Sequence, residues 1–209
     1  MDAADRVRLL EAMLIELGKF GREAIDLPRV LRHSRVSAAD FAAKYSDLDA
    51  CLADAFREFS TRLDAVARRG CEIDDDRSID EGRRWPERVW GGLQALLIEL
   101  SSRPELARAL ACTFPSLGLA EQAGYQGFVE GFVPLLARGR EFPGAEQDLP
   151  AEVEMLAVGA AEAIIFAEIA SGRAAELPAM GPSILFSLLV PFLGSGSAAA
   201  EMERAGRSS

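Results

Sequence analysis

The sequence has 209 residues, of which 49% are hydrophobic, so it is long enough for one medium domain or for a small domain joined to a larger one. The formal net charge of −10 argues against indiscriminate binding to nucleic acids. Three cysteines without a C-x-x-C spacing, no visible signal peptide and no apolar stretch long enough for a membrane span predict a reduced, cytoplasmic protein.

The first quarter of the chain predicts three short helices and the start of a long one. Apolar residues at steps of three and four indicate a helix over residues 4–18, which Gly18 and Gly21 would end. Asp26 can cap a second, short helix, and Ser37 can cap a third over about 38–44. Asp47 can cap a long helix over about 48–69, because apolar residues continue along one face.

The remaining sequence predicts five further helices after an acidic break at 71–82. They begin near Pro86 and at Pro104, and then occupy about 118–138, 150–171 and 178–193. Pro134 is expected to kink the third of them. Residues 194–209 are small and polar, which is typical of a disordered tail. Strand-forming runs are scarce, so the predicted fold class is all-α.

The segment over 178–193 is apolar almost all round, so it must be buried on several sides. In the last helix of a chain, this pattern indicates burial against another subunit. The alternative is the central core helix of a monomer.

Three short helices with a short turn between the second and the third, followed by a long helix, are typical of a helix-turn-helix head. Here the sequence resembles the TetR (tetracycline-repressor-like) family of transcription regulators, and its C-terminal part is similar to actinobacterial members. The likeness rests on Gly21, Leu27, Val30, Leu31, "VS" at 36 and 37, Phe41, Tyr45 and "SDLDACLADAF", and on the later phrases "RPELARAL", "GFVEGFVPLLARGR", "GAAEAI", "GRAAELPAM" and "LLVPFLG".

This resemblance implies an all-α homodimer with a helix-turn-helix head at 1–46 and a ligand-binding and dimerisation domain at 47–193. In the family, the third helix of each head enters a DNA major groove, and the last two helices form the dimer. A ligand that binds in the larger domain lowers the affinity for operator DNA.

The head departs from the family at several contacts. Arg35 stands at the usual turn glycine, where a positive φ would cost a bulky residue on the order of 1 kcal/mol. Asp40, Ala42 and Leu48 replace a threonine, a phosphate-binding tyrosine and a lysine. However, residues 19–44 hold six basic and three acidic side chains. The candidate DNA-binding residues are Arg29, Arg32, Arg35, Ser37, Ala38, Lys44 and Tyr45, the last as an anchor of the recognition helix.

The aromatic residues of the larger domain lie on helices that line the ligand pocket in the family. As a set they predict a small, apolar or aromatic ligand, although each one alone is more often a plain core residue. The candidate ligand-binding residues are Trp90, Phe114, Tyr125, Phe128, Phe132 and Phe166.

No catalytic triad, phosphate-binding loop or metal-ligand spacing is visible, and the only histidine, His33, has no partners for catalysis. The sequence therefore predicts no enzyme, no metal and no cofactor. The expected function is a ligand-responsive transcriptional repressor. The alternative is a module of the same fold that binds a small molecule or a protein and no longer binds a specific DNA sequence.

Overall fold

The computed structural model describes residues 1–71, 84–113, 127, 129–146 and 148–207. These residues form helices and connecting turns and no strand, which confirms the all-α prediction. They divide into two compact units. The first consists of Met1–Arg62 together with the helix over 104–113, and the second of Leu63–Ser102 together with the described residues from 127 onward. The predicted domain boundary at 46 and 47 is a functional division, and it stays a prediction.

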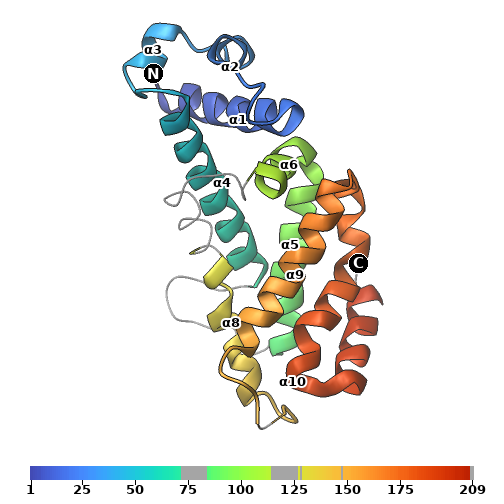
Figure 1. Ribbon diagram of the computed structural model, residues 1–209. Helices are drawn as coiled ribbons and strands as arrows, with labels where there is room; N and C mark the ends of the chain where they lie inside the picture. Colours follow the sequence, from blue (N-terminus) through green and yellow to red (C-terminus); the bar gives the residue numbers. More distant parts are fainter. Residues whose placement is uncertain (72–83, 114–126, 128, 147, 208–209) are drawn as a thin grey trace. The chain divides into compact units, whose positions relative to one another are not determined.

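The first unit holds the helix-turn-helix head (Figure 1). Its helices are α1 (Ala3–Phe20), α2 (Leu27–Ser34), α3 (Ala38–Ala42), the first part of α4 (Leu48–Gly70) and α6 (Pro104–Thr113).

The predicted caps of three of these helices are confirmed. The side chain of Asp26 accepts the backbone N–H of Arg29 at 2.8 Å, and Ser37 accepts that of Asp40 at 3.0 Å. Asp47 accepts the backbone N–H of Ala50 at 2.8 Å. Each cap satisfies an N–H group that the first turn of a helix leaves unpaired, so the starts of α2, α3 and α4 are set by local sequence.

The prediction that Gly18 ends the first helix is wrong, because Gly18 lies inside α1. A Cβ atom at Gly18 would lie 2.0 Å from the backbone oxygen of Glu105, so α1 and α6 touch through their backbones. The helix ends at Gly21, whose φ of 77° is a conformation that glycine adopts without strain. Gly18 is therefore a packing residue, and only Gly21 is a stop.

In the second unit, α5 (Trp85–Ser102) packs against α10 (Leu177–Arg207), and α10 packs against α9 (Val153–Ala170) (Figure 1). The short helix α8 (Val133–Ala137) contacts α9, and two 3₁₀ turns, η2 (Arg138–Glu141) and η3 (Ala174–Glu176), connect the helices.

The helix predicted over 118–138 is described only from residue 127 onward, and the rest of it lies outside the described residues. The chain turns at Gly131 and Phe132, and α8 begins directly afterward with Pro134 in its first turn. A proline costs no hydrogen bond there, so the chain bends before Pro134 rather than at it. The predicted acidic break at 71–82 lies outside the described residues except for Cys71.

The prediction of a disordered tail is wrong for residues 195–207. At Gly194 the backbone leaves the helical region (φ 68°, ψ 167°), and α10 then continues as a second helical segment to Arg207. Ala198, Glu201 and Ala205 of this C-terminal segment are buried. Alanine, glutamate and arginine are good helix formers, and the small residues let the segment pack closely.

The first segment of α10 is a central helix of its own unit. Ile184, Leu189 and Phe192 have no exposed surface in a single chain. This arrangement matches the alternative of a central core helix and removes the argument for a second subunit that rested on the apolar character of 178–193.

The stretch Ala174–Arg207 is long and apolar enough to cross a membrane, judged by length and composition alone, although the sequence predicted no such span. Within its most apolar window, 44% of the residues are buried inside the protein, and the helix is interrupted at Gly194. Core helices of water-soluble proteins often have the same length and composition, so this stretch is weak support for a membrane span.

Candidate functional site

The turn between α2 and α3 is made by Arg35, which ends α2 in the left-handed conformation (φ 59°, ψ 28°). Among the described residues, it is the only one other than glycine with a positive φ. The strain expected from the sequence is therefore present. Arg35 therefore ends α2, and α3 begins three residues later at Ala38. The side chain of Arg35 remains exposed.

The helix α3, which is the candidate recognition helix, presents Ser37 and Ala38 on the surface and buries Phe41 and Tyr45. The Ser37 hydroxyl donates a hydrogen bond to the Asp40 carboxylate at 2.6 Å, which holds the pKa of Asp40 below its usual range. The Asp40 carboxylate therefore binds the same hydroxyl that caps the helix.

Tyr45 is an anchor rather than a surface contact. Its ring lies 5.5 Å from that of Phe41, and its hydroxyl donates a hydrogen bond to Asp54 of α4 at 2.6 Å. Burial, and then the hydrogen bond to Asp54, raises the pKa of Tyr45. Asp54 also accepts hydrogen bonds from Nη2 and Nε of Arg6, on α1, at 2.9 and 3.2 Å.

The network has two further members, because Arg6 Nη1 donates to Glu58 at 2.8 Å and Arg57 Nη1 donates to Asp54 at 3.3 Å. Burial alone would raise the pKa of Asp54, but hydrogen bonds from Arg6 and Tyr45 outweigh it and lower that pKa. The network thereby ties α1, α4 and the turn that follows α3 together. Sequence reasoning identified Tyr45 but missed Arg6 and Asp54, because nothing in their spacing predicts this contact.

The cations of the head fall into two groups. Arg32, Arg35 and Lys44 are exposed and form no ion pair with the described residues. Arg29, in contrast, lies 4.3 Å over the ring of Phe20, and its Nε lies 3.9 Å from a carboxylate oxygen of Glu16. The same carboxylate binds His33, with Nδ1 at 2.8 Å. Of the four candidate cations, three are available to an external anion and Arg29 is held.

Replacing Arg35 with glycine is expected to raise the free energy of unfolding by about 0.5–1 kcal/mol, because glycine adopts a positive φ without strain but gains entropy in the unfolded chain. Urea denaturation of Arg35→Gly would measure the gain. Arg35→Ala is the matched control, since alanine also removes the guanidinium but keeps the Cβ atom and its strain. Equal stability of the two variants would contradict the prediction.

The structure describes three of the six candidate ligand-binding aromatic residues, and it does not place these three in one pocket. Phe114, Tyr125 and Phe128 lie outside the described residues. Phe132 precedes α8 and Phe166 lies on α9, and both are half-buried. Trp90, which is 9% exposed, lines a pocket in which neither of these phenylalanines takes part.

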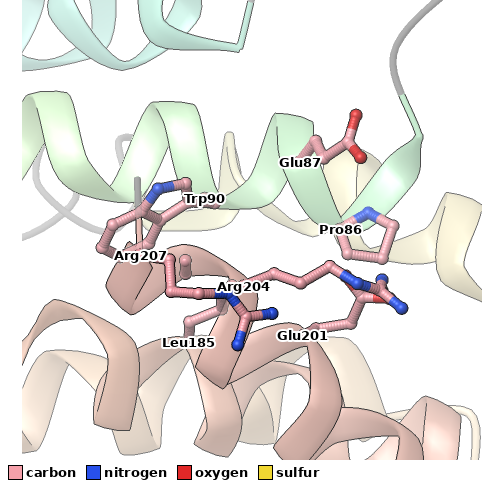
Figure 2. A pocket seen from close by; sticks show the side chains of 8 residues that line it. Pro86, Glu87, Trp90, Leu185, Glu201, Arg204 and Arg207 are labelled. Carbon is pink, nitrogen blue, oxygen red and sulfur yellow. The ribbon is translucent and has the colours of Figure 1, made fainter. Parts of the chain in front are cut away.

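This pocket lies between the first turns of α5 and the two segments of α10 and has a volume of about 310 Å³ (Figure 2). We refer to it as the α5–α10 pocket. Its lining combines apolar and charged side chains, namely Pro86, Glu87, Trp90, Leu185, Glu201, Arg204, Ala205 and Arg207. The volume lies at the lower end of the range of small-molecule sites. No group of three potential metal ligands occurs among the described residues.

Comparisons with known proteins show what this architecture is similar to. No family model and no curated protein sequence matches the chain. Among solved structures, the fatty acid degradation regulator FadR from Bacillus halodurans has a TM-score of 0.74 at 14% identity, over 90% of this chain and 96% of that one. TylP, a TetR regulator from Streptomyces fradiae, has a TM-score of 0.68 at 19% identity, over 99% and 97%.

A third solved structure, RolR in complex with the ligand resorcinol, has a TM-score of 0.59 at 14% identity, over 96% of this chain and 93% of that one. The head and the helical body thus define an all-helical protein of the helix-turn-helix class. More particularly, the chain has the fold of TetR-family transcription regulators, which confirms the fold that the sequence resemblance implied. The likeness to actinobacterial members stays a prediction.

Proposed function

We propose that the protein is a ligand-responsive, DNA-binding transcription regulator of the cytoplasm. In this proposal it is a repressor that a small, largely apolar ligand releases from its operator. The observation that carries the proposal is that Arg32, Arg35 and Lys44, around a short capped helix, are exposed and form no ion pair within the described part of the chain. Cations placed in this way can neutralise phosphates, while the start of α3 at Ser37 and Ala38 is exposed and can approach base edges.

A specific observation also favours the second candidate function, a module without sequence-specific DNA binding. Ala42 and Leu48 cannot supply the tyrosine and lysine contacts of the family, and the start of α3 carries the ionised Asp40. A carboxylate repels phosphate, and the hydrogen bond from the neutral Ser37 hydroxyl keeps Asp40 ionised. Because three exposed cations, Arg32, Arg35 and Lys44, belong to the same head, we favour the regulator.

A gel shift with DNA from the region that flanks the protein's own gene would test the proposal. A regulator is expected to retain this DNA in the presence of excess competitor, and footprinting should show a palindrome-like site with half-sites about 34–36 Å apart or more. Failure to bind at low salt would overturn the regulator and leave the second candidate function.

We further propose that two copies pair through the last two helices, α9 and α10. The support comes from α9, whose outward face is apolar over several turns, with Leu156 67% exposed and Met155 41% exposed. Along the same face lie Ala160, Ala163 and Ala167, which are also exposed. An apolar face that contains small residues lets a second helix approach closely. Two such faces related by a two-fold axis are self-complementary.

The variant Leu156→Arg is expected to convert a micromolar dimer into a monomer, because a charge buried without a partner at a dimer interface costs several kcal/mol. Analytical ultracentrifugation would measure the change. Ile98→Arg is the matched control, since Ile98 is 51% exposed but lies on α5. A wild-type protein that is monomeric at this concentration would refute the dimer itself.

The ligand half of the proposal rests on the aromatic side chains of the second unit. The similar structure of RolR contains resorcinol, a small aromatic molecule, so a protein of this fold holds an aromatic ligand. In this chain, Trp90, Phe132 and Phe166, together with Phe114, Tyr125 and Phe128, remain our candidates for contacts with such a ligand.

A further inference from the structure

The geometry points to the α5–α10 pocket as the binding site of an organic anion, namely a carboxylate attached to an aromatic or alicyclic body of one or two rings. This inference deepens the proposed function and rests on its ligand-responsive half. It places the ligand against the C-terminal segment of α10, residues 195–207, and it adds a carboxylate to the small, largely apolar ligand that we expect.

The apolar part of the pocket is suited to a flat ring. Pro86 and Trp90 from α5 lie across the pocket from Leu185 of α10 (Figure 2). Ala205 is the fourth apolar residue of the lining. The indole of Trp90 is held in place, because it packs against Gly181, where a Cβ atom would lie 2.9 Å from two ring carbons. A fixed aromatic surface binds a ring at low cost in side-chain entropy.

The charged side chains that line the pocket are Glu87, Glu201, Arg204 and Arg207, so their formal charges balance. Glu201 is buried and forms ion pairs with both Arg84 and Arg204, so its charge is compensated within the protein. Glu87 accepts the backbone N–H of Arg84 at 3.2 Å.

Arg207 lines the same pocket, is exposed and forms no ion pair with the described residues. Arg84, which lies outside the lining, pairs with Glu201 as Arg204 does, so Arg207 is left without a carboxylate partner among the described residues, in a protein whose net charge is −10. An anion near Arg207 would therefore find local attraction on a molecule that otherwise repels it.

The shape and the charge together select the ligand class. A volume of about 310 Å³ accommodates a body of one or two rings but not a long chain. A planar guanidinium binds a carboxylate through two parallel hydrogen bonds, which a neutral ligand cannot match. A ring on Trp90 with a carboxylate on Arg207 would use both parts of the pocket at once.

The test uses two probes with the same ring and nearly the same size, the anion 1-naphthoate and its neutral amide, 1-naphthamide. Isothermal titration calorimetry on the full chain without DNA would give both affinities. The wild type is expected to bind the naphthoate about tenfold more tightly than the amide, since a charge-assisted hydrogen bond is stronger than a neutral one. Arg207→Gln should remove most of this preference, and Arg207→Lys should restore part of it.

Arg138→Gln, which changes an exposed arginine on η2 outside the pocket, is the matched control and should bind both probes as the wild type does. Trp90→Phe should weaken both probes alike.

Equal binding of the two probes by the wild type, binding of neither, or equal effects of Arg207→Gln and Arg138→Gln would overturn the inference. These results do not depend on DNA. Loss of the anion site alone would leave the gel shift intact, whereas a failed gel shift with intact naphthoate binding would refute only the regulator.

Discussion

Asp54→Ala is expected to lower the free energy of unfolding by about 2–4 kcal/mol, because it removes the shared partner of two groups at once. Without Asp54, the Arg6 guanidinium loses its two-nitrogen contact and the Tyr45 hydroxyl loses its acceptor inside the head. The side chains of Arg6 and Asp54 are only 29% and 13% exposed, so water replaces these partners poorly. Urea denaturation followed by circular dichroism would measure the loss.

Asp49→Ala is the matched control on the same helix. Asp49 pairs with Arg22, but its side chain is 69% exposed, and exposed ion pairs contribute at most about 1 kcal/mol. If both variants lose the same small amount, the network does not hold the head together. A second consequence concerns function: the end of α3 loses its tie to α1 and α4, so DNA affinity should fall in Asp54→Ala even at temperatures where the head stays folded.

The pH dependence of stability should change in the same variant. Hydrogen bonds from Arg6 and Tyr45 hold the pKa of Asp54 below the ordinary value of an aspartate, about 3.9. A carboxylate with a lowered pKa contributes its stabilisation fully above the ordinary value, and this contribution is lost as the pH falls through the lowered pKa. The wild type should therefore lose more stability than Asp54→Ala between about pH 5 and pH 2.

Most of the fold follows from local sequence signals. The caps at Asp26, Ser37 and Asp47 act on their own first turns, so spacing alone predicts where α2, α3 and α4 begin. The exceptions depend on contacts between distant parts of the chain. Gly18 resembles a helix stop, but a glycine is needed there because the backbone of Glu105 leaves no room for a Cβ atom. The C-terminal segment resembles a disordered tail, but Ala198 and Ala205 are buried once the chain turns at Gly194.

The candidate site follows from the sequence to a smaller extent. The positive φ of Arg35 could be predicted, because the resemblance places a glycine at that turn. The difference between Arg29 and Arg32 could not be predicted, since both are basic residues of one short helix. Only the structure shows that the first lies on Phe20 while the second has no ion-pair partner among the described residues. The α5–α10 pocket was also missed, because half of its lining belongs to the segment expected to be disordered.

Replacing Arg32, Arg35 and Lys44 together with glutamine is expected to abolish most DNA affinity. If each cation neutralises one phosphate, the slope of log affinity against log salt should become shallower by about 0.9 per contact, hence by about five for a dimer with two heads. Affinity at 0.15 M salt should fall at least about a hundredfold. Fluorescence anisotropy at four or more salt concentrations would measure both quantities, with circular dichroism as the control for folding.

A matched pair of single variants within α2 tests whether DNA binding depends on exposed cations alone or on every cation of the head. Arg29→Gln and Arg32→Gln remove the same charge three residues apart, but Arg29 is held by Phe20 and Glu16. Arg32→Gln should reduce the slope by about one unit per head, whereas Arg29→Gln should leave it nearly unchanged and instead lower stability.

The reverse change is Leu48→Lys, which adds a cation at the half-buried start of α4, where the family resemblance places a lysine. It should strengthen binding to all DNA sequences alike and steepen the slope by about one unit per head. If the arginine variants behave alike and Leu48→Lys changes nothing, the cations of the head do not face phosphate. Under that outcome the exposed charge of Arg32, Arg35 and Lys44 would serve only solubility, and the module that binds a small molecule or a protein without DNA would be the better description.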